Sequence, residues 1–237
     1  MTKRICTVCA RAGSKGLSNK NIRIFCGKPM IAYSILQAKT TGLFECVAVS
    51  SDSDEILDMA RQWGADFLIR RPAEMASDMA AKTPAIRHCV KEVERLCGIT
   101  FDVAVDLSVT SPLRSPEDIL GATRLLETKK VPKVITGQPS KCSPYFSLVE
   151  LDPEGYTVVS KHLSKPIVRR QDSPVCYDMN GAVFVWTREG LFTDQQVKTL
   201  LYEMPQERSI DIDTEIDFEI AEFLYRKVSR RGLSYAN

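Results

Sequence analysis

The stretch CARAGSKGLSNKN, residues 9–21, decides how the chain is organised. An apolar run at residues 5–10 leads into it, and the segment MIAYSILQAKTTG, residues 30–42, follows with apolar residues at helical spacing. A buried strand, a basic glycine-containing loop and a helix, in that order, place backbone N–H groups and positive charge around a phosphate group. The stretch therefore predicts an anion-binding loop after the first strand of an α/β fold.

The loop is not one of the common nucleotide-binding motifs. It matches neither G-x-x-x-x-G-K-[ST] nor G-x-G-x-x-G, which argues against a P-loop and against a dinucleotide-binding fingerprint. Arg11, Lys15 and Lys20 supply its charge, and Gly13 and Gly16 allow its backbone to approach an anion closely. The alternative is that these charges are only solvated surface.

Apolar, strand-like runs alternate with helical patterns through the first half of the chain. Strands are expected at residues 46–52, 65–71, 101–109 and 133–137, with helices at 53–64, 83–98 and 115–130 between them. The expected caps of these helices are Ser53 or Ser51, then Thr83, and then Ser115 with Asp118 closing a capping box. Such alternation predicts an α/β fold, Rossmann-like, with a mainly parallel sheet flanked by helices on both faces. In such sheets ligands bind beyond the carboxyl ends of the strands.

The alternation breaks at about residue 138. Short strand-like runs around the turn DPEG, residues 152–155, predict a small antiparallel insert over about residues 138–175. Regular character resumes with a strand at 181–186, and a short strand at 209–213 is expected to lead into the last helix. We see no internal repeat, so residues 1–237 are interpreted as a single domain carrying one insert.

Charge and composition exclude several classes of function. The chain has 32 basic and 30 acidic residues and no basic stretches interleaved with aromatic residues, which argues against a nucleic-acid partner. No run approaches the roughly 18 apolar residues of a membrane helix, and the apolar run after the first basic residues is too short for a signal peptide. We therefore expect no membrane partner and a cytoplasmic location.

The eight cysteines are scattered, as expected for reduced thiols. Cys6 and Cys9 form a C-x-x-C pattern, but residues an odd number apart on a strand point to opposite faces. No second pair or histidine cluster lies nearby to complete a zinc site. Buried structural cysteines are the favoured interpretation over metal binding.

Two carboxylates in RSIDIDTEID, residues 208–217, are candidate metal ligands. If the segment is extended, Asp211 and Asp213 share a face about 7 Å apart, where they can converge on one Mg²⁺ ion. The alternative is that both acids cap the next helix, although residues 214–217 already form a capping box. The chain has only two histidines, which disfavours histidine-based catalysis and shifts weight to positioned cations and a metal.

Several motifs together resemble those of the CMP-sialic acid synthetases, or acylneuraminate cytidylyltransferases. The carriers of the resemblance occur in the expected order over essentially the whole chain: ARAGSKGLSNKN (10–21), RRPAEMASDMA (70–80), TSPLR (110–114), RRQD (169–172), YDMNGAVFVW (177–186) and SIDIDTEIDFEIAE (209–222). The resemblance implies the nucleotide-diphospho-sugar transferase fold and a homodimer whose insert completes the partner's sugar site. It also implies the reaction of CTP with a nonulosonic (sialic-type) acid, giving the CMP-sugar and pyrophosphate.

The resemblance also implies roles for individual residues. The expected catalytic residues are Arg11 and Lys20, which stabilise charge on the triphosphate, and the Mg²⁺ ligands Asp211 and Asp213. The expected substrate-binding residues are Lys15 at the triphosphate, Asn21, Arg71, Ser77 and Asp78 around the cytidine, and Arg170, Gln171 and Asn180 near the sugar acid. Either Arg169 or Arg170 would bind the sugar carboxylate.

Two departures from the family pattern bear on the substrate. Members specific for N-acetylneuraminic acid typically have LQPTSPLR, whereas this chain has LSVTSPLR, so Ser108 replaces an amide expected at the sugar. Phe184 replaces a typical tyrosine, and YDMN replaces a more usual RPN. Lost hydrogen-bond partners discriminate strongly between substrates. We therefore hypothesise legionaminic acid as the substrate, with CMP-N-acetylneuraminic, CMP-pseudaminic and, less favoured, CMP-KDO synthesis as alternatives; a non-catalytic nucleotide-sugar-binding protein is disfavoured.

Overall fold

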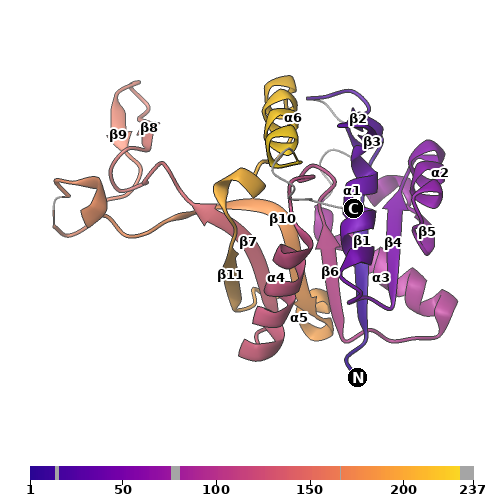
Figure 1. Ribbon diagram of the computed structural model, residues 1–237. Coiled ribbons are helices and arrows are strands. Elements are labelled where there is room, and N and C mark those ends of the chain that lie inside the picture. Colours follow the sequence, from indigo (N-terminus) through magenta and orange to yellow (C-terminus); the bar gives the residue numbers. More distant parts are fainter. Residues whose placement is uncertain (14–15, 76–80, 166, 230–237) are drawn as a thin grey trace.

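A seven-stranded sheet forms the centre of the molecule. The computed structural model describes residues 1–13, 16–75, 81–165 and 167–229 (Figure 1). The strands lie in the spatial order β11 (Thr199–Glu203), β7 (Lys133–Pro139), β10 (Tyr177–Thr187), β6 (Val103–Leu107), β1 (Arg4–Cys9), β4 (Cys46–Ser51) and β5 (Phe67–Arg70). Only the pairings of β10 are antiparallel, which confirms the mainly parallel sheet.

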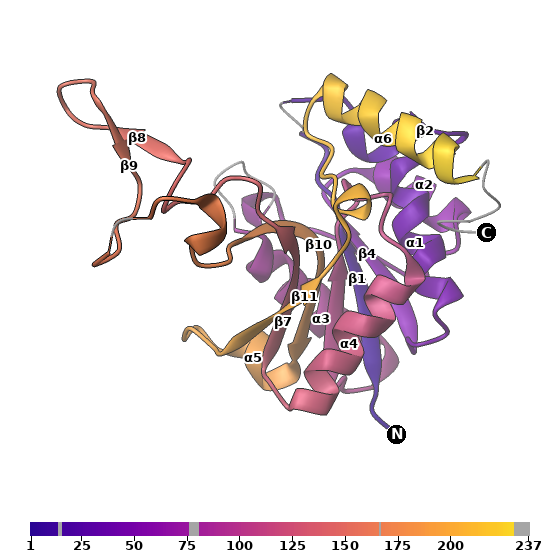
Figure 2. The same ribbon diagram turned by 60° about the vertical axis from the view of Figure 1, so that its left-hand side comes forward.

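Helices cover both faces of the sheet, as predicted (Figures 1 and 2). One face packs against α1 (Met30–Thr40), α2 (Asp54–Gln62) and α4 (Pro116–Lys129), and the other against α3 (Lys82–Cys97) and α5 (Arg188–Phe192). The last helix, α6 (Glu215–Ser229), joins the first of these cores beside the hairpin of β2 (Ile24–Phe25) and β3 (Lys28–Pro29). None of the helices in the described ranges is long and apolar enough to cross a membrane.

The cysteines and the helix caps test the sequence analysis at single residues. Cys6 lies in one core and Cys9 against the other, so their thiols diverge, and all eight cysteines are unpaired. Ser53 caps α2, and Ser115 and Asp118 form the expected capping box of α4. The expected N-cap Thr83 is wrong by two residues, because α3 begins at Lys82 and Ala81 is its N-cap.

The insert leaves the sheet as an arm, defined here as residues 140–176. It connects β7 to β10 and contains an antiparallel hairpin of β8 (Val149–Leu151) and β9 (Thr157–Val159), which confirms the antiparallel prediction. Gly155 adopts a φ of 90° in the turn of this hairpin, a conformation that favours glycine. Both views show the arm projecting away from the rest of the molecule (Figures 1 and 2).

The expected strand at residues 209–213 is wrong, and β11 was missed. Residues 209–213 form no strand; their backbone is tied to the sheet region where Ile212 N–H donates to the Thr110 carbonyl oxygen at 2.9 Å. The edge of β7 is already occupied by β11, so the segment has no ladder to join. The predicted alternation nevertheless persists, with Ile212 buried and Asp211 and Asp213 exposed.

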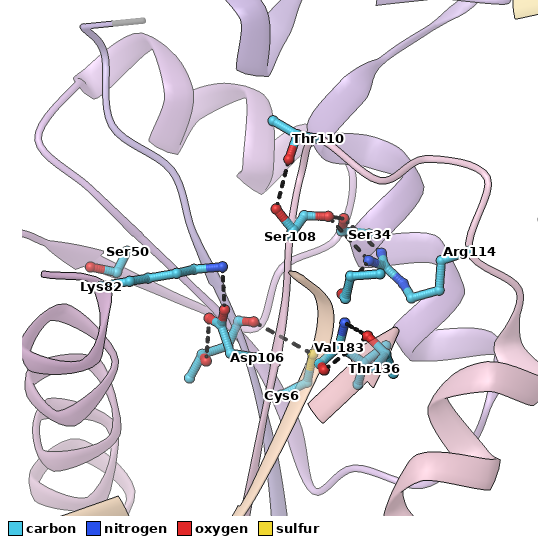
Figure 3. Close-up of polar contacts among 12 residues, drawn as sticks. Cys6, Ser34, Ser50, Lys82, Asp106, Ser108, Thr110, Arg114, Thr136 and Val183 are labelled. Carbon is cyan, nitrogen blue, oxygen red and sulfur yellow. Dashed lines mark hydrogen bonds and ion pairs between the residues drawn. The ribbon is translucent and has the colours of Figure 1, made fainter. Parts of the chain in front are cut away.

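A fully buried arginine joins the carboxyl end of β6 to its neighbours (Figure 3). Arg114 Nη1 donates to the carbonyl oxygens of Ser108 (3.1 Å) and Ala182 (2.8 Å). Its Nη2 donates to Ser34 Oγ (2.9 Å) and Gln37 Oε1 (2.7 Å), both on α1. Burial lowers the pKa of this guanidinium to about 10, which leaves it charged at neutral pH. Arg114 therefore holds β6, β10 and α1 together.

Replacing this arginine is expected to destabilise the whole domain. Arg114→Met removes four buried hydrogen bonds, and we expect a loss of about 3–5 kcal/mol in the free energy of unfolding. Urea denaturation followed by circular dichroism measures it. Arg124→Met, at an exposed position of α4, serves as the control and should change stability by less than about 0.5 kcal/mol. Equal stability of the two variants would contradict the role assigned to Arg114.

Candidate active site

The loop after β1 is folded by its own polar contacts. Asn19 adopts a left-handed conformation with a φ of 50° and leads into the 3₁₀ turn η1 (Lys20–Ile22). Asn21 is buried, and its Nδ2 donates to the Arg11 carbonyl oxygen at 2.8 Å. Asn21 thus closes the loop on itself, and its side-chain nitrogen is engaged there.

This loop meets the segment before α6, nearly 200 residues further along the chain. Lys20 Nζ pairs with Asp213 Oδ1 at 2.8 Å, and only 12% of the lysine side chain is exposed. Gly16 lies so close to the backbone of Asp213 that a Cβ atom would collide with its carbonyl oxygen. The close approach explains why glycine occupies this position of the loop.

Asp211 and Asp213 stand as a pair at this contact. Both carboxylates are exposed, yet the surrounding protein withdraws enough water from Asp211 to raise its pKa, and the charge of Asp213 adds to the rise. A hydrogen bond with Thr110 opposes it. In the part of the chain that the structure describes, no group of three or more His, Cys, Asp or Glu side chains forms a metal site. A metal here would therefore be shared between two carboxylates and oxygens from outside the protein.

Three contacts hold the acidic segment in place. Asn180 Nδ2 donates to Ser209 Oγ at 2.9 Å, and Arg208 makes two hydrogen bonds of 2.9 Å with the buried Asp118. The third is the backbone bond from Ile212 to Thr110. Asn180 is buried and also accepts from Thr136 Oγ1 at 2.6 Å, so its amide is engaged inside the protein. It positions the acidic segment from within.

Two further candidate residues lie at the carboxyl ends of β5 and β6, which β1 and β4 separate in the sheet. Arg71, which follows β5, is buried and donates Nη2 to the Ser50 carbonyl oxygen at 3.0 Å. Ser108, which follows β6, has its Oγ 2.8 Å from Thr110 Oγ1, while its carbonyl accepts from Arg114 (Figure 3). Ser108 therefore reaches Asp211 through Thr110.

Other candidates are not gathered at this contact. Arg170 and Gln171 lie in the arm, where they line a cavity of about 420 Å³ with neighbouring arm residues. Arg170 Nη2 donates to the Ser140 carbonyl oxygen at 3.3 Å. Phe184 faces the α3 side of the sheet and stacks on Trp186 with ring centroids 5.5 Å apart. Lys15, Ser77 and Asp78 lie outside the described residues.

The structure adds residues that sequence analysis missed. Thr110 connects Ser108, Asp211 and the backbone of Ile212, and Asp52 accepts from the Ala12 N–H at 3.0 Å in the glycine loop. Asp106, fully buried on β6, pairs with Lys82. Asp106 could have been found from the sequence, because it is a single acid inside an apolar strand. The residue type of Thr110 does not by itself indicate a functional role.

A sheet whose carboxyl ends carry a basic loop facing two acidic residues is the framework of a nucleotidyltransferase. The chain belongs to the cytidylyltransferase family, because the family model described as Cytidylyltransferase matches residues 5–231. It is therefore an enzyme that transfers a cytidylyl group.

Relatives and a structural neighbour agree with this family. The chain is 40% identical over 230 residues to post-translational flagellin modification protein B of Campylobacter coli, covering 96% of this chain and 97% of that protein. It is 38% identical over 237 residues to CMP-N,N'-diacetyllegionaminic acid synthase of Campylobacter jejuni, covering 99% and 98%. The structure of CMP:2-keto-3-deoxy-manno-octonic acid synthetase complexed with CTP has the same fold, with a TM-score of 0.67 at 17% identity over 95% of this chain and 99% of that one.

The contact between Gly16 and Asp213 yields a test of the assembled site. Gly16→Ala should push the loop away from the acidic segment, and we expect kcat/KM for cytidylyl transfer to fall at least tenfold, to about a tenth or less. Steady-state kinetics measures the effect. Glu219→Ala, at an exposed position of α6, is the control, and its kcat/KM should stay within about twofold. A similar loss in both variants would show that the close approach is irrelevant to activity.

Proposed function

We propose that the enzyme couples CTP to a nonulosonic acid, giving the CMP-sugar and pyrophosphate, and that its acid substrate is of the legionaminic type. The observation that carries the reaction is the Lys20–Asp213 contact, which brings a cation of the loop to the acidic pair Asp211 and Asp213. The substrate class is supported by CMP-N,N'-diacetyllegionaminic acid synthases of Campylobacter jejuni and Legionella pneumophila, 38% and 32% identical to this chain.

The acidic pair fits a Mg²⁺ ion. Two exposed carboxylates present hard oxygen ligands close enough for the charge of Asp213 to act on Asp211. Bound between them and the phosphates, Mg²⁺ would polarise the phosphates and lower the pKa of the attacking hydroxyl.

The chain's own residues supply positioning and charge. One of the three N–H donors of Lys20 bonds Asp213, and the other two are available to phosphate oxygens. Arg11, at the start of the same loop, adds a second cation beside the leaving pyrophosphate. The anomeric hydroxyl of the acid attacks the α-phosphorus and gives up its proton to solvent. The bond from the α-phosphorus to the oxygen that bridges it to the β-phosphorus breaks, and pyrophosphate departs with that oxygen. Thr110 holds Asp211 by a hydrogen bond while this happens.

Two residues that the family resemblance places near the sugar acid, Ser108 and Phe184, are the basis for the proposed substrate class. Ser108 offers a hydroxyl already engaged with Thr110, and Phe184 offers an apolar ring, so neither replaces the amide and phenol typical of N-acetylneuraminate-specific enzymes. An unmatched polar group on the wrong acid loses binding energy at such a surface. The pseudaminic acid cytidylyltransferase of Campylobacter jejuni, 29% identical to this chain, keeps pseudaminic acid as the second candidate.

Pyrophosphate release with CTP and Mg²⁺ tests the proposed function. Legionaminic, pseudaminic, N-acetylneuraminic and KDO acids are compared, with other nucleoside triphosphates as controls. We expect kcat/KM for legionaminic acid to exceed that for N-acetylneuraminic acid by at least tenfold, on the order of 10–100. A preference for another of the acids would keep the reaction and reject the substrate, and no release with any acid would reject the reaction itself.

The same assay tests the acidic pair. Asp211→Ala should reduce turnover by about 100-fold or more, because it removes half of the metal-binding carboxylates. Glu219→Ala, at an exposed position on α6, is the matched control and should keep the kcat of the wild-type enzyme. Undiminished turnover by Asp211→Ala would overturn the metal assignment.

We further propose that the arm makes the enzyme a homodimer and carries Arg170 and Gln171 to the partner's site. The arm is short of internal packing: Leu151 is 70% exposed, Val168 81% and Val175 77%. A two-stranded hairpin is marginally stable by itself, and apolar surface of this kind marks an interface. Arg170 and Gln171 lie in this arm and not at the Lys20–Asp213 contact, which suits contribution in trans.

Complementation between two inactive variants tests the dimer. Arg170→Ala and Asp211→Ala are each expected to be inactive, but a mixture refolded together should regain about a quarter of wild-type activity, because half of the dimers have one intact site. Sedimentation equilibrium establishes the mass of the assembly. A monomeric mass, or a mixture as inactive as its components, would contradict the proposal.

A further inference from the structure

A buried ion pair lies beneath the strand end that carries Ser108. Asp106 on β6 is 0% exposed, accepts from Thr7 Oγ1 at 2.9 Å, and pairs with Lys82 Nζ at 2.7 Å (Figure 3). Asp106 and Ser108 are two residues apart, so they face the same side of the sheet. Nothing in the reaction proposed above uses this pair.

A gain in stability from charge compensation does not by itself explain why this ion pair is buried. Taking a carboxylate out of water is costly, and apolar residues of similar volume often stabilise a core as well as or better than a buried ion pair. The other residues of β6, Val103 to Val105 and Leu107, are all apolar and buried. A carboxylate in the middle of such a strand is explained if it holds something outside the core.

Lys82 is the part of the pair that reaches solvent. Its side chain is 38% exposed, and its ammonium lies 5.5 Å from the centroid of the Phe184 ring. An ammonium has three N–H donors, and that of Lys82 lies in an ion pair with Asp106 at its partly exposed end. Lys82 therefore presents N–H donors to solvent beside the ring of Phe184, the residue that the family resemblance places near the sugar acid.

We propose that Lys82 is a specificity-determining residue that donates a hydrogen bond to an oxygen of the sugar acid, and that Asp106 is the positioning residue that aims it. The proposal rests on the proposed function, since it assigns a residue to the same acid-binding pocket. Phe184 provides the apolar floor next to the ammonium, and Asp106 keeps the lysine from swinging out to solvent.

A paired replacement separates this role from charge compensation. Lys82→Met alone leaves the buried Asp106 carboxylate without its cation and is expected to lower Tm. The double variant Lys82→Met/Asp106→Asn removes both charges while keeping an acceptor for Thr7, so its Tm should return close to that of the wild type. We expect the KM of the double variant for the acid to be about tenfold higher than that of the wild-type enzyme, and its KM for CTP to stay within about twofold.

The outcomes are distinct from those of the substrate assay. Lys133→Met is the control, because Lys133 lies 5.9 Å from the same Phe184 ring but at the amino end of β7, and its KM values should match the wild type. Lys82→Arg, which keeps charge and donors, should restore most of the affinity for the acid. A double variant with wild-type KM for the acid would overturn the role of Lys82, whereas a wild-type enzyme that turns over no acid would overturn the proposed function as well.

Discussion

The buried guanidinium of Arg114 is the interaction on which the site depends. Strand β10 runs antiparallel to its neighbours, and at the end of β6 its Ala182 carbonyl, which accepts from the Ser108 N–H at 3.2 Å, and the Ser108 carbonyl both accept from Arg114 Nη1. Arg114 satisfies both, and α1 supplies two more acceptors to hold the guanidinium plane. Because five donors lie in one rigid fork, arginine is suited to this position and lysine is not.

The catalytic geometry is built outward from that point. The turn that Arg114 holds carries Thr110, whose carbonyl anchors Ile212 and whose side chain bonds Asp211. Asp213 then meets Lys20 of the glycine loop. Only 12% of the Lys20 side chain but 70% of the Asp213 side chain is exposed, so the aspartate is the accessible half of this ion pair. The rigid part of the site lies in the core, and the exchangeable part lies at the surface.

The arm differs from the rest of the chain in how much of its apolar surface is exposed. The sheet buries nearly all of its apolar residues between helices, whereas the arm exposes its own along a hairpin that has no second layer. Such a surface is stable only when something covers it. In the proposed homodimer, a second copy of the same arm related by a two-fold axis would provide this cover.

The sequence by itself determined the alternating fold, the antiparallel insert, the divergent thiols, the caps of α2 and α4, and the outward alternation of Asp211 and Asp213. These are local properties, set by periodicity and by hydrogen bonds within a few residues. Only the tertiary structure decided that residues 209–213 cross the strand ends without pairing, that β11 takes the edge of β7, and that Asn180 is engaged internally. It also decided which lysine meets which aspartate, and it revealed Asp106 with Lys82. Each of these depends on which distant segment has already occupied a neighbouring position, and neither periodicity nor propensity carries that information.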